Sequence, residues 1–327
     1  MPFIKHRKIF LGIAVVVVLA SGIIIGTLGL NLGIDFTGGS LTEVSYAERP
    51  AKENLSAELD QLGLGGYSLR ETVDDEGRDG YLLRTRDLTE DERISVESTV
   101  LTAGAESSIT RFTSIVPVIG QELKDKAVWA VVAVSLIIIL YVAFAFAGVS
   151  YPVGSWVYGG ITILALLHDV IVPTAAMALM GYFLGLEADV LFIMALLAVL
   201  GYSVNDTIVV FDRVRENLME FRKEKKTKVV GTDGMEREEV TYSLEKPFAE
   251  IVGMSVTQTL LRSINTSATT LVALLALYFV GGEVTQTFSL VLIVGVIAGT
   301  YSSICIANPL LVFVAEKRIL GASKDLD

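Results

Sequence analysis

The sequence predicts an α-helical polytopic membrane protein with six transmembrane helices and a small α+β ferredoxin-like (βαββαβ) external domain between helices 1 and 2. Three observations lead to this fold class. Hydrophobic residues make up 52% of the 327 residues, and the mean hydropathy is +0.59, which is high for a soluble domain. Uncharged segments long enough to cross a bilayer, at about 20 residues per helix, recur along the chain. One polar segment, residues 31–125, separates the first of them from the others.

The first apolar segment, residues 9–30, predicts transmembrane helix 1 after a short N-terminus, residues 1–8. Lys5, Arg7 and Lys8 precede it, as basic residues precede the apolar part of a secretory signal peptide. The apolar run is too long for such a peptide, and no clear A-x-A cleavage site follows it. We therefore expect an uncleaved membrane anchor.

The other apolar segments predict five more helices. Residues 127–167 are uncharged and too long for one crossing, and glycine and proline in the stretch 146–154 indicate a tight turn that divides them. The expected helices 2 to 6 are residues 127–147, 153–180, 188–211, 263–281 and 285–314. They leave a loop, 212–262, and a C-terminus, 315–327.

Basic residues predict the orientation. An even number of spans puts both termini on one side of the membrane, and the lysines and arginines that flank the spans fall on that side. They are Lys5, Arg7, Lys8, Arg213, Arg215, Arg222, Lys223, Arg262, Lys317 and Arg318. The positive-inside rule then predicts cytoplasmic termini and an external segment 31–125.

The external segment reads as strands and helices in the order β-α-β-β-α-β, the split ferredoxin-like unit. The expected strands are 39–47, 67–74, 80–87 and 107–120, and the expected helices are 51–64 and 89–104. Thr89 is a favourable N-cap for the second helix, and carboxylates fill its first turn.

The charge of this segment limits its partners. It holds 19 acidic and 9 basic residues and so carries nearly all of the net charge of −11. This balance argues against a nucleic-acid or anionic-lipid partner there, and solubility of an external domain accounts for it. The chain's only cysteine, Cys305, lies in helix 6, so we expect no internal disulfide and no thiolate metal site.

A glycine-rich motif, "NLGIDFTGGS" (31–40), links helix 1 to the external segment. Gly33, Gly38 and Gly39 permit tight backbone turns. The motif lacks a Lys-Ser/Thr pair and leads into a strand, so it is not a phosphate-binding loop. We expect a hinge or a packed turn, in which Asp35 is either a turn cap or a surface carboxylate.

Four ionisable residues lie within the predicted membrane depth: His168, Asp169, Asp206 and Arg262. Such residues are rare and often mark ion or proton routes. Asp206, next to Asn205, is expected near the inner boundary of helix 4, a short step from Arg262. Two interpretations stay open: Asp206 binds and releases a proton, or a static Asp206–Arg262 ion pair pins helices 4 and 5 together.

The other polar residues of the spans have weaker signals. His168 and Asp169 point about 100° apart on a helix, so we expect no relay between them. Asp169 suits a proton path and a helix-packing hydrogen bond equally, and His168 reads as a packing residue. Residues that can hold water or orient the Asp206 carboxylate are Asn205, Asn265, Thr266 and Ser267. Gly295 and Gly299 form a GxxxG pattern, which predicts close helix packing in helix 6.

Four motifs, in this order over nearly the whole chain, resemble those of the SecD/SecF family of bacterial protein-export subunits. They are "GIDFTGGSLTEV" (33–44), "LLHDVIV" (166–172), "GYSVNDTIVVFDRVREN" (201–217) and "SVTQTLLRSINTSATTL" (255–271). The short external segment is similar to the SecF branch, because SecD carries a larger one. The chain departs from the family pattern at residues 223–251, a longer connection that reads as an inserted hairpin or a loop around Gly231–Gly234.

The resemblance implies an auxiliary subunit of the Sec translocase in a bacterial inner membrane. It implies SecD, the SecYEG channel, YajC, membrane lipid and unfolded preprotein as partners, with no nucleic acid, no cofactor and no enzymatic activity. The family, part of the resistance-nodulation-division superfamily, is driven by the proton motive force. The resemblance thus assigns Asp206 and Arg262 to proton coupling, and sodium is the alternative ion because a carboxylate with Asn and Thr oxygens can hold it.

Three rival functions fit the sequence less well. Small-molecule or lipid exporters of the same superfamily carry two six-span halves in one chain, and this chain corresponds to one half. An intramembrane aspartyl protease needs two carboxylates that share a proton, and "GYSVN" before Asp206 differs from the Gly-x-Gly-Asp of those enzymes. A purely structural subunit leaves the polar residues of helices 3 to 5 without a role.

Overall fold

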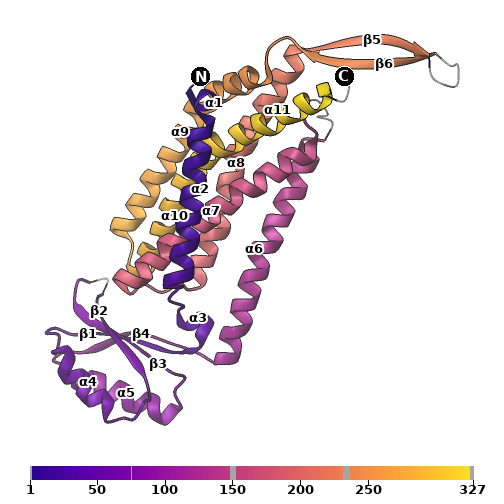
Figure 1. Cartoon of the computed structure of the whole chain (residues 1–327). Helices are drawn as coiled ribbons and strands as arrows, with labels where there is room; N and C mark the ends of the chain where they lie inside the picture. Colours follow the sequence, from indigo (N-terminus) through magenta and orange to yellow (C-terminus); the bar gives the residue numbers. More distant parts are fainter. Residues whose placement is uncertain (1, 75, 148–151, 231–235, 325–327) are drawn as a thin grey trace.

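The fold is a bundle of long helices with a small sheet domain at one end, as the sequence predicts. The computed structural model describes residues 2–74, 76–147, 152–230 and 236–324. Figure 1 shows the sheet domain at one end of the bundle and both termini at the other; we call these the domain end and the termini end. Among the described residues, six helices are long and apolar enough to cross a membrane: α2 (Arg7–Leu28), α6 (Pro117–Ala145), α7 (Ser155–Leu184), α8 (Val190–Phe221), α9 (Phe248–Val280) and a last span. That span runs from α10 (Glu283–Ser302) through the π-helix η1 (Ser303–Ala307) into α11 (Asn308–Lys324), and a short α1 (Pro2–Lys5) precedes α2.

The sheet domain has the predicted ferredoxin-like order. Its elements are β1 (Gly39–Ser45), α4 (Lys52–Asp60), β2 (Tyr67–Val73), β3 (Asp79–Thr85), α5 (Glu90–Thr102) and β4 (Ser108–Ile115). The strands pair antiparallel in the order β2-β3-β1-β4. Helices α4 and α5 cover one face, where buried Leu55, Leu59, Val96 and Val100 meet Tyr81 from the sheet. The other face is left toward the bundle (Figure 1).

Several helices are longer than their apolar segments. The last strand ends at Ile115 rather than at 120, and α6 begins at Pro117 rather than at 127, because proline suits the first helical position. Likewise α8 continues to Phe221, and α9 begins at Phe248 rather than at 263. Apolar composition marks only the part of a helix that lies in hydrocarbon, and good helix formers extend it into polar surroundings. The expected loop 212–262 is therefore helical at both of its ends.

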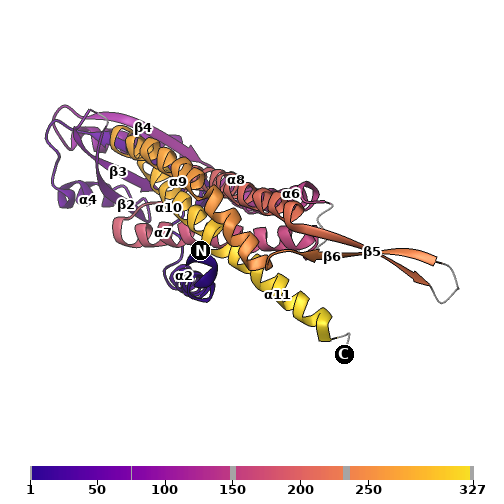
Figure 2. The same cartoon turned by 90° about the horizontal axis from the view of Figure 1, so that it is seen from above.

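Between α8 and α9 the chain forms a two-stranded hairpin, one of the two structures expected for the longer connection. Strand β5 (Arg222–Val230) pairs antiparallel with β6 (Glu236–Leu244). Figure 2 shows the hairpin projecting away from the bundle. The stretch Gly231–Gly234, around which the hairpin or loop was expected, and residues 148–151 of the expected turn within 146–154 lie outside the described residues.

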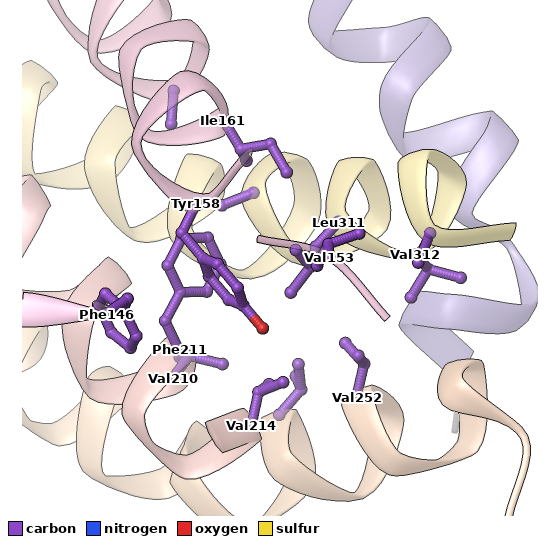
Figure 3. Packing of buried hydrophobic residues seen from close by; sticks show 14 of the residues in the cluster. Phe146, Val153, Tyr158, Ile161, Val210, Phe211, Val214, Val252, Leu311 and Val312 are labelled. Carbon is purple, nitrogen blue, oxygen red and sulfur yellow. The ribbon is translucent and has the colours of Figure 1, made fainter. Parts of the chain in front are cut away.

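An apolar cluster packs the helices near the termini end. The rings of Phe146 and Tyr158 stack with centroids 5.1 Å apart, and Phe211 meets Tyr158 edge-on at 5.1 Å. Figure 3 shows part of this cluster, which also takes in Val252 of α9. The helices are unequally enclosed: only 11% of the most apolar window of α9 is buried, against 44% in α8. Helix α9 therefore keeps an open face.

Candidate functional site

Helices α8 and α10 approach closely along the predicted GxxxG pattern. A Cβ on Gly295 would lie 2.1 Å from Cγ2 of Val199, and one on Gly299 would lie 2.9 Å from Cβ of Ser203. Both distances are too short for a real side chain, so only glycine permits this contact. The contact brings Ser203 of α8 and the end of α10 to the same level of the bundle.

At that level a single carboxylate joins three helices. Asp169 of α7 is 0% exposed. Its Oδ2 accepts hydrogen bonds from Oγ of Ser203 on α8 and from Oγ of Ser302 on α10, the latter at 2.6 Å. Its Oδ1 lies 2.8 Å from Nδ1 of His168. Both carboxylate oxygens are therefore partnered.

His168 and Asp169 are in direct contact although they point in different directions on the helix, and the expectation that they form no relay stays a prediction. Their Cα–Cβ bonds diverge, but rotation of the imidazole brings Nδ1 back to the neighbouring carboxylate. The ring also lies against Tyr301, with centroids 5.9 Å apart. His168 and Tyr301 line an apolar groove of about 420 Å³ between α2, α7 and α10.

Asp206 has the opposite environment. It is 4% exposed, and its Oδ2 has no hydrogen-bond partner among the described residues. Ser263 of α9 lies close enough to interact with this carboxylate, but its buried Oγ makes no hydrogen bond of normal geometry within the described residues. An unpartnered polar atom inside a membrane costs several kcal/mol. The pair thus forms a buried site that a proton, water or another chain can satisfy.

Neither Arg262 nor Asn205 forms a hydrogen bond or ion pair with Asp206 among the described residues, although Arg262 lies close enough to act on it electrostatically. Both side chains are exposed on the surface of the bundle, and no ion pair joins Arg262 to Asp206 within the described ranges. The two side chains differ because successive residues of a helix point about 100° apart around its axis. Ser263 therefore faces α8, and Arg262 points away. The static ion pair does not form in the isolated chain.

A seam of polar contacts runs along α8 and its neighbours on both sides of Asp206. Toward the domain end, the hydroxyl of Tyr202 donates to Oγ of Ser267 at 3.3 Å, and the hydroxyls of Ser267 and Thr300 form a hydrogen bond of 2.7 Å. Toward the termini end, Nδ2 of Asn217 donates to Oγ of Ser255 at 2.7 Å and to Oε1 of Gln258 at 3.0 Å. Nε of Arg213 donates to the same Gln258 oxygen at 2.7 Å. Asp206 thus lies in the middle of a polar interface that continues to one end of the bundle.

The glycine-rich motif packs against the loop between α7 and α8. The amide of Ala188 donates to the carbonyl of Asn31 at 2.7 Å, and that of Gly33 donates to the carbonyl of Ala188 at 2.8 Å. Asp35 Oδ2 accepts from the amide of Val190 at 2.9 Å. Asp35 is thus a cap, but for the start of α8 rather than for its own turn.

The paired glycines allow a crossing of three elements. Gly38 and Gly39 have φ angles of +72° and +121°. A Cβ on Gly38 would lie 2.5 Å from Cα of Pro117, and one on Gly39 would lie 2.4 Å from the carbonyl oxygen of Thr85. The motif is therefore a packed turn that holds β1 against α6 and β3.

Two arginines of the sheet also hold the α7–α8 loop. Nη1 of Arg70 donates to the carbonyl of Gly185 at 2.6 Å. Arg84 forms an ion pair with Glu187 at 3.0 Å and donates to Oγ1 of Thr37 at 2.7 Å. Sequence reasoning missed these contacts, because no local pattern connects residues that lie 47 to 115 positions apart. The domain is thereby attached to α8, which carries Asp206 about 24 Å farther along.

No cluster of three or more His, Cys, Asp or Glu side chains that could hold a metal ion occurs among the residues that the structure describes. The polar contacts of Asp169 and Asp206 also involve Ser203, Ser263 and Ser302, which the sequence did not single out as site residues. For Ser203 a signal existed, since it lies one turn before Asp206 on α8.

Comparisons with known proteins give consistent matches. The profile "Protein export membrane protein SecD/SecF, C-terminal" matches residues 95–317, and "SecD/SecF GG Motif" matches residues 23–48. The chain is 35% identical over 326 residues to "Protein translocase subunit SecF" of Thermobaculum terrenum, covering 97% of this chain and 95% of that one. It is 35% identical over 303 residues to "Protein translocase subunit SecDF" of Thermus thermophilus, covering 92% of this chain and 36% of the longer one.

A solved structure is similar over almost the whole fold. The crystal structure of SecDF, a translocon-associated membrane protein from Thermus thermophilus, superposes with a TM-score of 0.77 at 30% sequence identity. The match covers 96% of this chain and 38% of that chain.

Proposed function

Because the chain belongs to the SecD/SecF family of protein-export membrane proteins, we propose that it couples the proton motive force to protein export. It is a multi-pass membrane protein and an auxiliary subunit of the Sec translocase. Its relatives over nearly the full length are translocase subunits, so half of a small-molecule or lipid exporter is not favoured. Its place is the inner membrane of a bacterium, with both termini in the cytoplasm and the sheet domain outside. The basic residues that flank the spans support this orientation.

Asp206 is the residue on which this proposal rests. Its unpartnered oxygen inside the bundle can be satisfied by a proton, and the polar seam leads from it toward the termini end. A carboxylate that is neutral in one conformation and charged in another can carry a proton across. Asp206 and Ser263 together offer three side-chain oxygens, fewer than a hard metal cation usually takes, so we propose the proton as the coupling ion.

We infer that Arg262 contacts the partner subunit. Within the described residues Arg262 forms no ion pair, a guanidinium without one is costly at membrane depth, and α9 has an open face. SecD packs against this face and supplies the missing polar or acidic group to Arg262. The fused Thermus relative, in which SecD and SecF form one chain by name, supports this pairing.

The sheet domain transmits the movement. The contacts Asp35–Val190 and Arg84–Glu187 attach it to the start of α8, so a shift of α8 at Asp206 moves the domain. On the outer side the domain acts on unfolded preprotein that emerges from the SecYEG channel, with YajC as a further partner. The chain itself makes and breaks no covalent bond of the substrate.

The test uses membrane vesicles that contain the chain, SecD and the SecYEG channel. Late translocation of a preprotein, after its ATP-driven start, is followed for the wild type and Asp206→Asn with and without a proton gradient. Asparagine keeps the size and removes the titration, so the contribution of the gradient is expected to disappear while the complex still assembles. Asp212→Asn, on the same helix and paired with Arg215, is the matched control. A gradient effect that survives in Asp206→Asn would contradict the proposal.

A further inference from the structure

The hydrogen bonds of Asp169 depend on its charge. A charged carboxylate only accepts, and its two oxygens can take all three surrounding donors, Ser203, Ser302 and His168. A protonated carboxyl group must itself donate one hydrogen bond. It therefore cannot keep both serines and the imidazole as donors: either the His168 ring changes tautomer and accepts at Nδ1, or one of the serines turns away.

Ser302 has a second place for its proton. Its Oγ lies 2.6 Å from Asp169 and 3.1 Å from the carbonyl oxygen of Gly299. A hydroxyl group has one hydrogen, so it donates to the carboxylate or to the carbonyl. Each arrangement leaves Ser302 satisfied, which makes it a two-position contact between α7 and α10.

This contact lies at an irregular point of the last span. Ser302 is the final residue of α10, and the π-helix η1 follows directly. Pro309 lacks an amide hydrogen, and Nδ2 of Asn308 donates to the carbonyl of Ser303 at 2.6 Å. Isolated π-helical turns and prolines are the places where helices bend, and π-turns are frequent at functional sites.

From these contacts we propose that Asp169 is a charge-controlled clasp that fastens α8 and α10 to α7, and that its neutralisation frees the last span to bend at η1. Asp169 is a positioning residue: it grips α8 at Ser203, one turn before Asp206. The inference rests on the proposed function, because an ion that crosses the bundle is what changes the charge. The titratable groups around the clasp are His168 on α7, Tyr301 on α10 and Asp206 farther along α8, whereas α2 contributes apolar Ile13 and Val17 to the adjoining groove.

The chain carries its own reporter for this movement. Cys305, its only cysteine, lies buried in η1. The full chain, together with SecD in vesicles without a proton gradient, is treated with membrane-permeant N-ethylmaleimide at one fixed pH, and labelling of Cys305 is followed by mass spectrometry. Asp169→Asn carries a donor where the carboxylate only accepts, so it mimics the neutral clasp. We expect labelling about fivefold faster than in the wild type, because a small change in stability shifts an opening equilibrium by that factor.

A second pair of variants separates the clasp from a general loosening. Ser302→Ala removes one donor but keeps the charge, and it is also expected to speed labelling. The double variant should be no faster than the faster single one, because both changes open the same contact. Ser289→Ala is the matched control, since Ser289 is a buried serine of α10 that donates only to the backbone of Gln286.

Unchanged labelling in Asp169→Asn, or effects of the two variants that multiply, would overturn the clasp. This result is independent of export. Loss of the gradient effect in Asp206→Asn with unchanged labelling in Asp169→Asn would keep the proposed function and remove the clasp. The reverse outcome would keep the clasp as a packing device and remove the proton role of Asp206.

Discussion

Asp169 and Asp206 are both buried in the helical bundle, yet they differ in how their oxygens are satisfied. Asp169 accepts from two serines on other helices and faces an imidazole, whereas one oxygen of Asp206 has no partner among the described residues. Burial alone would have assigned the two carboxylates the same role. Their hydrogen bonds separate a group that holds the fold together from one that is open to exchange.

The most direct test of this difference is to remove the two carboxylates in turn and compare the effects on stability. Asp169→Ala removes the partner of Ser203 and of the His168 ring in a dry interior, while Ser302 can turn to the carbonyl of Gly299, so we expect it to lower the free energy of unfolding by about 3 kcal/mol. Asp206→Ala removes an unsatisfied oxygen and should change that free energy by less than about 1 kcal/mol. Steric trapping of the purified protein in bicelles measures both. Equal losses of unfolding free energy in the two variants would mean that the different hydrogen bonding of the two carboxylates does not affect stability.

A change at the α8–α10 contact tests the same difference without touching a carboxylate. Gly295→Ala places a methyl group into Val199, so α10 must move away from α8. We expect a loss of about 1–3 kcal/mol in unfolding free energy, as for other overpacked contacts. Because α8 and α9 are not separated, the polar seam at Asp206 should persist while the Ser302–Asp169 contact weakens.

The matched control is Gly201→Ala on α8, where a Cβ would meet nothing within 4 Å. This variant should be neutral or slightly stabilising, because alanine restricts the unfolded chain more than glycine does. If Gly201→Ala destabilised the protein as much as Gly295→Ala, helix packing at the GxxxG pattern would not be the cause.

The contrast also shows which features a sequence reveals. The apolar segments and the strand order are local patterns, so they predicted the six helices and the ferredoxin-like domain. The partners of Asp169 are 34 and 133 residues away along the chain, and no local pattern reports such distances. At α9 the limit was helical phase: Arg262 was the conspicuous residue, but its neighbour Ser263 faces Asp206.

A similar loss of information occurs at the helix ends. Apolar composition placed the start of the fifth span at 263, whereas α9 begins at Phe248. The polar residues that continue a helix beyond the bilayer are also common in loops, so their composition does not distinguish the two. The contacts of the glycine-rich motif with the α7–α8 loop likewise depend on how the helices are arranged and not on the motif alone.

A third carboxylate, that of Glu92, is hydrogen-bonded but not buried, so the effects of hydrogen bonding and burial can be compared. Glu92, on the surface of the sheet domain, accepts from Arg86 and from both the amide and the hydroxyl of Thr89. These donors, Arg86 first, lower the pKa of Glu92 from 4.5 to about 2. It is thus as fully partnered as Asp169, but it is surrounded by water. We therefore expect Glu92 to make the stability of the sheet domain depend on pH, and to have little effect on the folding of the bundle.

Because the pKa of Glu92 is lower in the folded than in the unfolded chain, its contribution to stability is present above about pH 4.5 and is lost as the pH falls toward 2. Hydrogen exchange of the α5 amides, corrected for the intrinsic pH effect, should therefore show less protection at pH 3 than at pH 6. Glu92→Gln should reduce this slope without abolishing it, because Arg93 also lowers the pKa of Glu90 in the same turn. An unaltered slope in Glu92→Gln would show that the capping carboxylate does not control the start of α5. A small effect here beside a large one in Asp169→Ala would mean that the same kind of donor set stabilises a carboxylate's surroundings strongly only where water cannot replace it.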